Sequence, residues 1–178
     1  MLRMPATRLF LSAALATGLV ACSGEAPADA PADAPSDAAT PGDVAAPVDV
    51  QAVLKERHDN FEGIGDSFKA LRGELEKDAP DFTLIAAKAS DINTRALKID
   101  GLFPAGTSVD DGLKTEALAT IWQQPEEFKA AAQKLVEESA KLVTLAGGGD
   151  KAAVAAQAMA MGGACKGCHD KFRLDDKK

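Results

Sequence analysis

The chain has 178 residues, a length that suits one domain of ordinary size. Its 27 acidic and 20 basic residues give a formal net charge of -7, which argues against nucleic acid as a partner because phosphates are held by basic surfaces. The same acidity would allow docking to a basic redox partner. Beyond the first 21 residues, no apolar stretch approaches the roughly 20 residues that a membrane-spanning helix needs.

Residues 1–21 have the features of an export signal. Arg3 and Arg8 form a positively charged start, and the apolar run of residues 9–20 is too short to span a membrane as a stable helix. Small residues and Cys22 follow at the expected cleavage point. This arrangement resembles a bacterial lipoprotein box, in which the cysteine becomes the lipidated first residue. The alternative is ordinary signal cleavage nearby, with Cys22 incidental.

Residues 22–47 repeat Ala, Pro and Asp, with no aromatic residue and almost no large aliphatic one. Such a segment cannot bury enough apolar surface to offset its chain entropy, and its prolines keep it extended. We interpret it as a flexible spacer between a membrane-held Cys22 and a folded body, residues 48–178. We therefore expect a periplasmic, lipid-anchored protein, and Ser23 after the cysteine favours the outer membrane.

The folded body contains four segments in which apolar residues recur at steps of three and four, the period of an amphipathic helix. The first of these segments runs from Val50 to Leu75, and the second runs from Phe82 to Ile99. Asp78 is expected to cap the start of the second helix, and Gly101 to end it.

A connection of 23 residues, 102–124, separates the second and third helices. It is long for a helical bundle, where roughly 2–8 residues are usual, so we expect it to cover one edge of a cofactor. Pro125 opens the third helix, glycines 147–149 break it, and Asp150 caps the fourth, which reaches Phe172. No segment alternates with the period of a strand. The sequence predicts an all-α, antiparallel four-helix bundle.

The fourth helix carries the motif Cys-Lys-Gly-Cys-His at residues 165–169, which is typical of covalent haem attachment. Two thiols add to the two vinyl groups of one haem, and the adjacent imidazole ligates its iron. Cys165, Cys168 and His169 share one helical face, so we expect the ring inside the bundle. A thioredoxin-like dithiol would need a βαβ context, and half a zinc site would need two more ligands; the sequence offers neither. With Cys22 lipidated, no cysteine remains for a disulfide.

Residues of the first helix are candidates for the opposite side of the haem. Arg57 occupies a position at which the helical pattern predicts an apolar residue. Its guanidinium either reaches solvent while the aliphatic part of the side chain packs against the core, or binds a haem propionate. Phe61, one turn further on, is either ordinary core or the cover of the iron's open side. His58 would lie near a propionate or at the surface, and it is the one other imidazole that could act as a sixth ligand.

The methionines of the chain after the export signal are Met159 and Met161, and both lie on the helix of the proximal His169. They cannot readily reach the opposite face of the haem. We therefore expect five-coordinate iron with a vacant site in an apolar pocket, where small neutral gases bind and anions are disfavoured.

The body, from about Val50 to Arg173, resembles the cytochrome c′ family. The resemblance rests on the run Cys-Lys-Gly-Cys-His-Asp-Lys-Phe-Arg at 165–173, on residues 114–122, which resemble the stretch before the family's third helix, and on Leu-Phe-Pro at 102–104. It implies a four-helix bundle, usually dimeric, with one high-spin, five-coordinate haem c that binds NO and CO.

The resemblance also implies roles for individual residues. Cys165 and Cys168 would hold the haem and His169 would be the proximal ligand. Arg173 would line the proximal pocket, while Arg57 would meet a propionate. The resemblance further places His58 beside a propionate, Thr115 and Glu116 at the haem, and Phe61 at the distal position, where many members have Met or Leu.

The function expected from the sequence is that of a non-enzymatic NO trap or carrier, with electron transfer as a further role. The alternative is a six-coordinate, low-spin electron carrier of the same fold, with His58 on the iron. Peroxidase activity is not expected, because the seam near Phe61 offers no acid–base group to break an O–O bond. A homodimer is expected from the resemblance.

Overall fold

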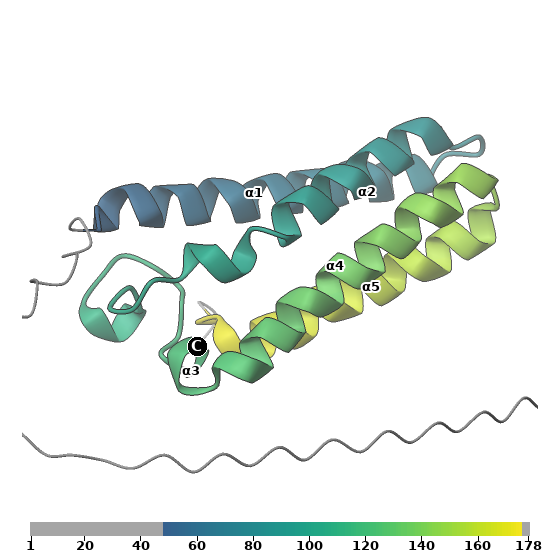
Figure 1. Cartoon of the computed structure of the whole chain (residues 1–178). Helices are drawn as coiled ribbons and strands as arrows, with labels where there is room; N and C mark the ends of the chain where they lie inside the picture. The colour runs from purple at the N-terminus through teal and green to yellow at the C-terminus, as the bar shows by residue number, and fades with distance from the viewer. Residues whose placement is uncertain (1–47, 176–178) are drawn as a thin grey trace, which may run out of the picture. The chain divides into compact units, whose positions relative to one another are not determined.

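The computed structural model describes residues 48–175 and confirms the all-α, four-helix architecture within that range (Figure 1). The predicted export signal, the predicted spacer and Cys22 lie outside the described residues. Four long helices run alternately up and down, and none of them is both long and apolar enough to cross a membrane. They are α1 (Val50–Leu75), α2 (Phe82–Ala96), α4 (Pro125–Gly148) and α5 (Lys151–Phe172).

The long connection between α2 and α4 contains three short helical turns. The 3-10 turns η1 (Ile99–Leu102) and η2 (Val109–Asp111) are followed by α3 (Thr120–Gln123). The second predicted helix is therefore shorter than expected: α2 ends at Ala96, and Ile99 belongs to η1.

The helix ends follow the local chemistry, with two corrections. Gly101 does not end α2, whose C-cap is Leu97; it lies within η1. Asp150 caps α5 as predicted, and Gly149 ends α4 in the left-handed conformation, with a φ of 69°. Asp78 does not cap α2; Asp81 does, because a capping side chain must directly precede the first helical residue. Its carboxylate accepts the Leu84 N–H at 3.0 Å.

The helix α1 has two different inner faces, which the apolar pattern alone does not distinguish. One face packs on α2 and carries three buried polar residues at seven-residue spacing, whose hydrogen bonds fix the register of α1 against α2. The apolar residues Leu54, Phe61 and Phe68 lie on the other face and are only half-buried. The polar bonds join Asn60 Nδ2 to Arg95 O at 3.2 Å, Ser67 Oγ to an Asp91 carboxylate oxygen at 2.7 Å, and Asp81 N to a Glu74 carboxylate oxygen at 3.3 Å.

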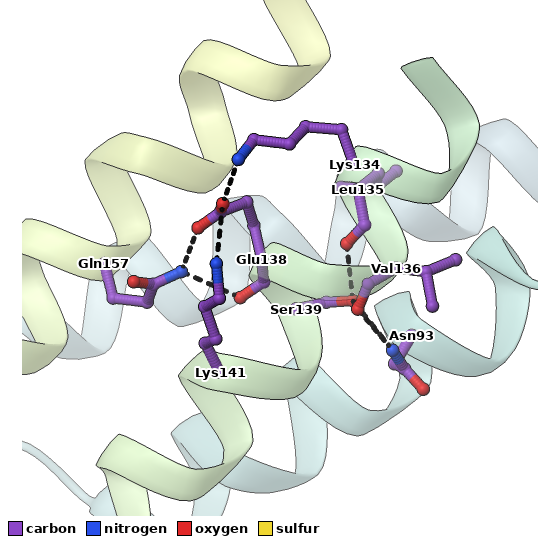
Figure 2. Close-up of polar contacts among 8 residues, drawn as sticks. All are labelled: Asn93, Lys134, Leu135, Val136, Glu138, Ser139, Lys141 and Gln157. Carbon is purple, nitrogen blue, oxygen red and sulfur yellow. Dashed lines mark hydrogen bonds and ion pairs between the residues drawn. The ribbon is translucent and has the colours of Figure 1, made fainter. Parts of the chain in front are cut away.

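A buried carboxylate joins α4 to α5 (Figure 2). Glu138 is 5% exposed. Its carboxylate accepts hydrogen bonds from Lys134 Nζ at 2.6 Å, from Gln157 Nε2 at 2.5 Å and from Lys141 Nζ at 3.2 Å. These donors, Lys134 first, lower the pKa of Glu138 from 4.5 to about 2. The side chain is thus held ionised across the contact between the two helices.

A second polar group in Figure 2 joins α2 to α4. Asn93 Nδ2 donates to Val136 O at 2.8 Å and to Ser139 Oγ at 3.0 Å. Ser139 is fully buried and in turn donates to Leu135 O at 2.7 Å. Three of the four sides of the bundle therefore carry a polar cross-link between helices.

The Glu138 contacts predict a specific acid sensitivity. Because the pKa of Glu138 is lower in the folded protein than in the unfolded chain, its contribution to the free energy of unfolding is complete above pH 4.5 and is lost as the pH falls toward about 2. Glu138→Gln should lower stability at neutral pH and flatten the stability profile in that acid window. Urea unfolding between pH 2 and pH 7 measures both. The exposed neighbour Glu137→Gln is the matched control; equal profiles for the two variants would contradict the assignment.

Candidate haem-binding site

A cavity of about 890 Å³ lies between α1 and α5. Of the four neighbouring pairs of long helices, these two contact each other least, so the space that would otherwise hold packed side chains is open. The half-buried apolar side chains of α1 form one wall and the cysteine–histidine motif of α5 forms the other. The connection, at residues 113–117, and α4 complete the lining.

Nine predicted site residues line this single cavity. Their positions in the sequence span more than a hundred residues, and the fold brings them together. They are Arg57, His58, Phe61, Thr115, Glu116, Cys165, Cys168, His169 and Arg173.

Cys165 and Cys168 lie one helical turn apart on α5 and are half-buried as free cysteines. Burial raises the pKa of both thiols, that of Cys168 to about 11. Such thiols are protonated at neutral pH, unlike the activated thiolates of thioredoxin-like sites. Residues 48–175 also contain no group of three His, Cys, Asp or Glu side chains suited to a metal ion, which disfavours a zinc site.

His169 follows Cys168 at the mouth of the cavity. Partial burial of the ring lowers its pKa, and the positive charge of Arg173 lowers it further, while Glu116 and Asp170 act in the opposite direction. The neutral imidazole that results is the form that binds a metal. The thiols, the imidazole and the cavity in front of them therefore fit a covalently attached haem.

The end of α5 is fastened to the connection beside His169. Leu118 N donates to Phe172 O at 3.1 Å, Leu174 N donates to Glu116 O at 2.8 Å, and an isolated antiparallel bridge pairs Ala117 with residue 173. The Arg173 guanidinium also donates to the Glu116 carboxylate at 2.5 Å. The connection thus lines the cavity beside the motif, as expected for a segment that covers one edge of a cofactor.

The guanidinium of Arg57 is buried, with the residue 5% exposed, so its head does not extend into water. It makes four hydrogen bonds, all to the connection, and lies 4.2 Å from the centroid of the Phe103 ring. The bonds run from Nε to Leu102 O (3.0 Å), from Nη1 to Thr107 O (3.0 Å) and Thr115 Oγ1 (3.3 Å), and from Nη2 to Thr107 Oγ1 (2.6 Å).

Each of these Arg57 partners is electrically neutral. A buried cation normally has an anionic partner, because desolvating the charge is costly. Burial lowers the pKa of the guanidinium, yet an arginine stays protonated at neutral pH. The arrangement therefore fits a negatively charged group in the adjacent cavity, and a haem propionate is such a group.

Phe61 and His58 lie differently on the α1 wall. The Phe61 ring is half-buried and meets Phe103 edge-on, with the ring centroids 6.2 Å apart. The His58 side chain is 76% exposed and its Nε2 lies 3.7 Å from a Glu62 carboxylate oxygen. Phe61 therefore belongs to the interior of the cavity and His58 to its rim.

Three further residues shape the site but were not recognised as site residues from the sequence. Phe103 lies against both Arg57 and Phe61, and the hydroxyl of the buried Thr107 accepts a hydrogen bond from the Arg57 guanidinium. Gly162 is where α5 approaches α1, because a Cβ there would lie 3.3 Å from Phe68 Cζ. A phenylalanine in a Leu-Phe-Pro run was visible as a motif, whereas nothing in the local sequence marks the other two.

A family model of cytochrome c′ matches residues 52–173, nearly all of the described part of the chain. The chain belongs to the cytochrome c′ family. It is 36% identical over 135 residues to the cytochrome c′ of Rhodospirillum rubrum, covering 74% of this chain and 88% of that protein. As in the rest of the family, the cofactor is a covalently attached c-type haem.

Solved structures of cytochromes c′ have the same fold. The structure of cytochrome c′ from Rhodobacter spheriodes superimposes with a TM-score of 0.66 at 34% identity, covering 72% of this chain and 99% of that one. A cytochrome c′ with an unusual ligand-controlled dimer dissociation gives a TM-score of 0.66 at 26% identity, covering 73% and 100%.

The two thiols can be tested as the points of haem attachment. The double variant Cys165→Ala/Cys168→Ala should carry no covalent haem, while each single variant should retain it through one thioether bond. Mass spectrometry of the denatured protein measures this directly. Lys166→Ala, an exposed change between the cysteines, is the control and should keep the full haem mass. Haem retained covalently in the double variant would contradict the assignment.

The close approach at Gly162 predicts a packing effect specific to that position. Gly162→Leu should push the Phe68 ring into the cavity and lower the free energy of unfolding by about 1–3 kcal/mol. Gly163→Leu is the matched control, because a Cβ there meets no atom within 4 Å. Urea unfolding of the haem-loaded proteins compares them, and equal stabilities would show that α1 and α5 are not in close contact.

Proposed function

We propose that this protein is a periplasmic, lipid-anchored cytochrome c′ whose five-coordinate haem iron binds NO and CO, and that it acts as a gas trap or carrier rather than an enzyme. Cys165 and Cys168 hold the haem, His169 is the proximal ligand, and Arg57 binds a propionate. Phe61 lies over the distal face. The bound haem supplies an iron with one open coordination position, and the side chains around it decide what reaches that position.

The observation that carries this proposal is the composition of the α1 wall opposite His169. Apart from the buried Arg57, whose guanidinium bonds to the connection, its interior part consists of the apolar side chains Leu54, Phe61, Ile64 and Phe68. Side chains of the cavity that could donate to iron lie exposed at the rim: His58, Glu62, Lys114 and Glu116.

An apolar distal face selects the kind of ligand. A neutral diatomic gas enters such a pocket without losing strong hydration, whereas an anion would have to leave water. The buried ionisable side chain that α1 contributes to the cavity lining is Arg57, and an arginine stays protonated, so it cannot accept and return a proton at the iron. Strong peroxidases require such proton transfer at the distal side. This supports a binding protein over a peroxidase.

One observation keeps the six-coordinate alternative open to test. His58 lines the cavity, and the sequence contains only two histidines. To reach the iron, its ring would have to leave solvent and its contact with Glu62 and pass inward beside Phe61. In that case the protein would be a low-spin electron carrier.

Absorption and resonance Raman spectra of the purified protein, with and without NO or CO, test the proposal. We expect a high-spin resting iron, a Soret shift on adding either gas to the ferrous protein, and no change of the resting spectrum in His58→Ala. No spectral change at saturating NO would overturn gas binding. A low-spin resting spectrum that is lost in His58→Ala would establish the alternative.

We also propose a homodimer and a lipid anchor at Cys22. The dimer is supported by the relative whose dimer dissociation is ligand-controlled, and the anchor by the lipoprotein-like pattern of residues 1–22. Sedimentation with and without CO tests the first, and a monomer under both conditions would contradict it. Cell fractionation tests the second: Cys22→Ala should move the protein from the membrane to the soluble periplasmic fraction.

A further inference from the structure

The connection between α2 and α4 is held to α1 by a buried clasp around Arg57. We use "clasp" for Arg57, the Leu102 carbonyl, Thr107 and Thr115, which are joined by the four hydrogen bonds described above. Thr107 is 1% exposed, and its hydroxyl both accepts from Nη2 at 2.6 Å and donates to Pro104 O at 2.7 Å. The clasp thus closes residues 102–107 around the guanidinium.

Phe103 connects the clasp to the side chains that line the cavity. The Arg57 guanidinium lies 4.2 Å from the centroid of the Phe103 ring, and the Phe103 carbonyl accepts the Trp122 Nε1–H at 3.0 Å. Both the ring and the backbone of Phe103 are therefore held in place. The same ring meets Phe128 edge-on at 4.8 Å between centroids and Phe61 at 6.2 Å. A cation against an aromatic face and edge-on aromatic pairs are both attractive, which favours one orientation of the Phe103 ring.

We infer that Arg57, through Thr107 and Phe103, is a positioning residue for Phe61, and that this clasp sets how readily a gas reaches the distal face of the haem. This inference rests on the proposed function and adds Thr107, which does not line the cavity, to the residues that control ligand entry. Four of the five N–H groups of Arg57 donate to the connection, which leaves one for the propionate that the proposed function assigns to this residue.

The physical reason is that the half-buried Phe61 ring lies on the wall of the haem cavity and not in the interface between two helices. On the protein side its ring meets the edge of Phe103. The Phe103 edge is then a main constraint on how far the Phe61 ring can swing. Loosening residues 102–107 should let the ring move aside and open the path to the iron.

A kinetic double-mutant cycle on the haem-loaded ferrous protein tests this. Thr107→Val keeps the shape of the side chain but removes the hydroxyl that Arg57 Nη2 contacts. It should raise the CO association rate about threefold to tenfold, as measured by flash photolysis. In a Phe61→Ala background, where there is no ring to position, the same change should have no effect on the rate.

A second measurement separates positioning from general destabilisation. Amide hydrogen exchange of residues 102–109 should be faster in Thr107→Val, while exchange in the middle of α2 and α4 stays as in the unaltered protein. Thr94→Val is the matched control: Thr94 is an exposed residue of α2 that bonds only to the carbonyl of its own helix at Ser90. It should change neither the CO rate nor the exchange of residues 102–109.

The outcomes distinguish the inference from the proposed function. If the unaltered protein binds no gas, the proposed function fails. If it binds CO but Thr107→Val leaves the rate unchanged, slows it, or raises it equally with Phe61 present and absent, the positioning role fails while gas binding stands. If Thr107→Val does not fold, Thr115→Val removes the longer 3.3 Å bond and should raise the rate by a smaller factor.

Discussion

The spacing of three side chains on one helical face determines the layout of this protein. Cys165, Cys168 and His169 can reach one flat ring only if that ring lies along α5, so α1 cannot pack on that face of α5. In the bundle, α1 packs on α2, α2 on α4 and α4 on α5, while a cavity of about 890 Å³ separates α1 from α5. The haem completes a core that the polypeptide alone leaves open.

The same constraint explains the two inner faces of α1. A helix with one closed neighbour and one cofactor cannot follow a single apolar stripe: the side chains that meet the haem must be apolar, while those that meet α2 can be polar if they are paired. Asn60, Ser67 and Glu74 are paired in this way, and Arg57 stands where the two faces meet. The position of that arginine accounts for its contacts with both the connection and the cavity.

Much of the architecture could be predicted because it depends on local chemistry. The period of the apolar residues predicted the four helices, Asp150 and Gly149 set the turn between α4 and α5, and the motif at 165–169 indicated the cofactor. The Asp78 cap was wrong for a local reason, because Asp81 is the residue that directly precedes α2. The features that were missed depend on distant partners. The hydrogen-bond partners of Arg57 lie 45 to 58 residues away in the sequence. No local pattern could therefore distinguish an arginine that reaches solvent from one that is buried against the connection.

The polar cross-links between helices have a consequence for how the cofactor gets in. Those described above tie α1 to α2, α2 to α4 and α4 to α5, whereas none of them ties α1 to α5. Parting the helices along any of these three seams breaks buried hydrogen bonds between them. The α1–α5 side is closed differently: Arg57 joins α1 to the connection, and residues 116–118 join the connection to the end of α5. Before the haem is attached, this side should therefore open by displacement of the connection, which uncovers both thiols while the other three seams stay closed.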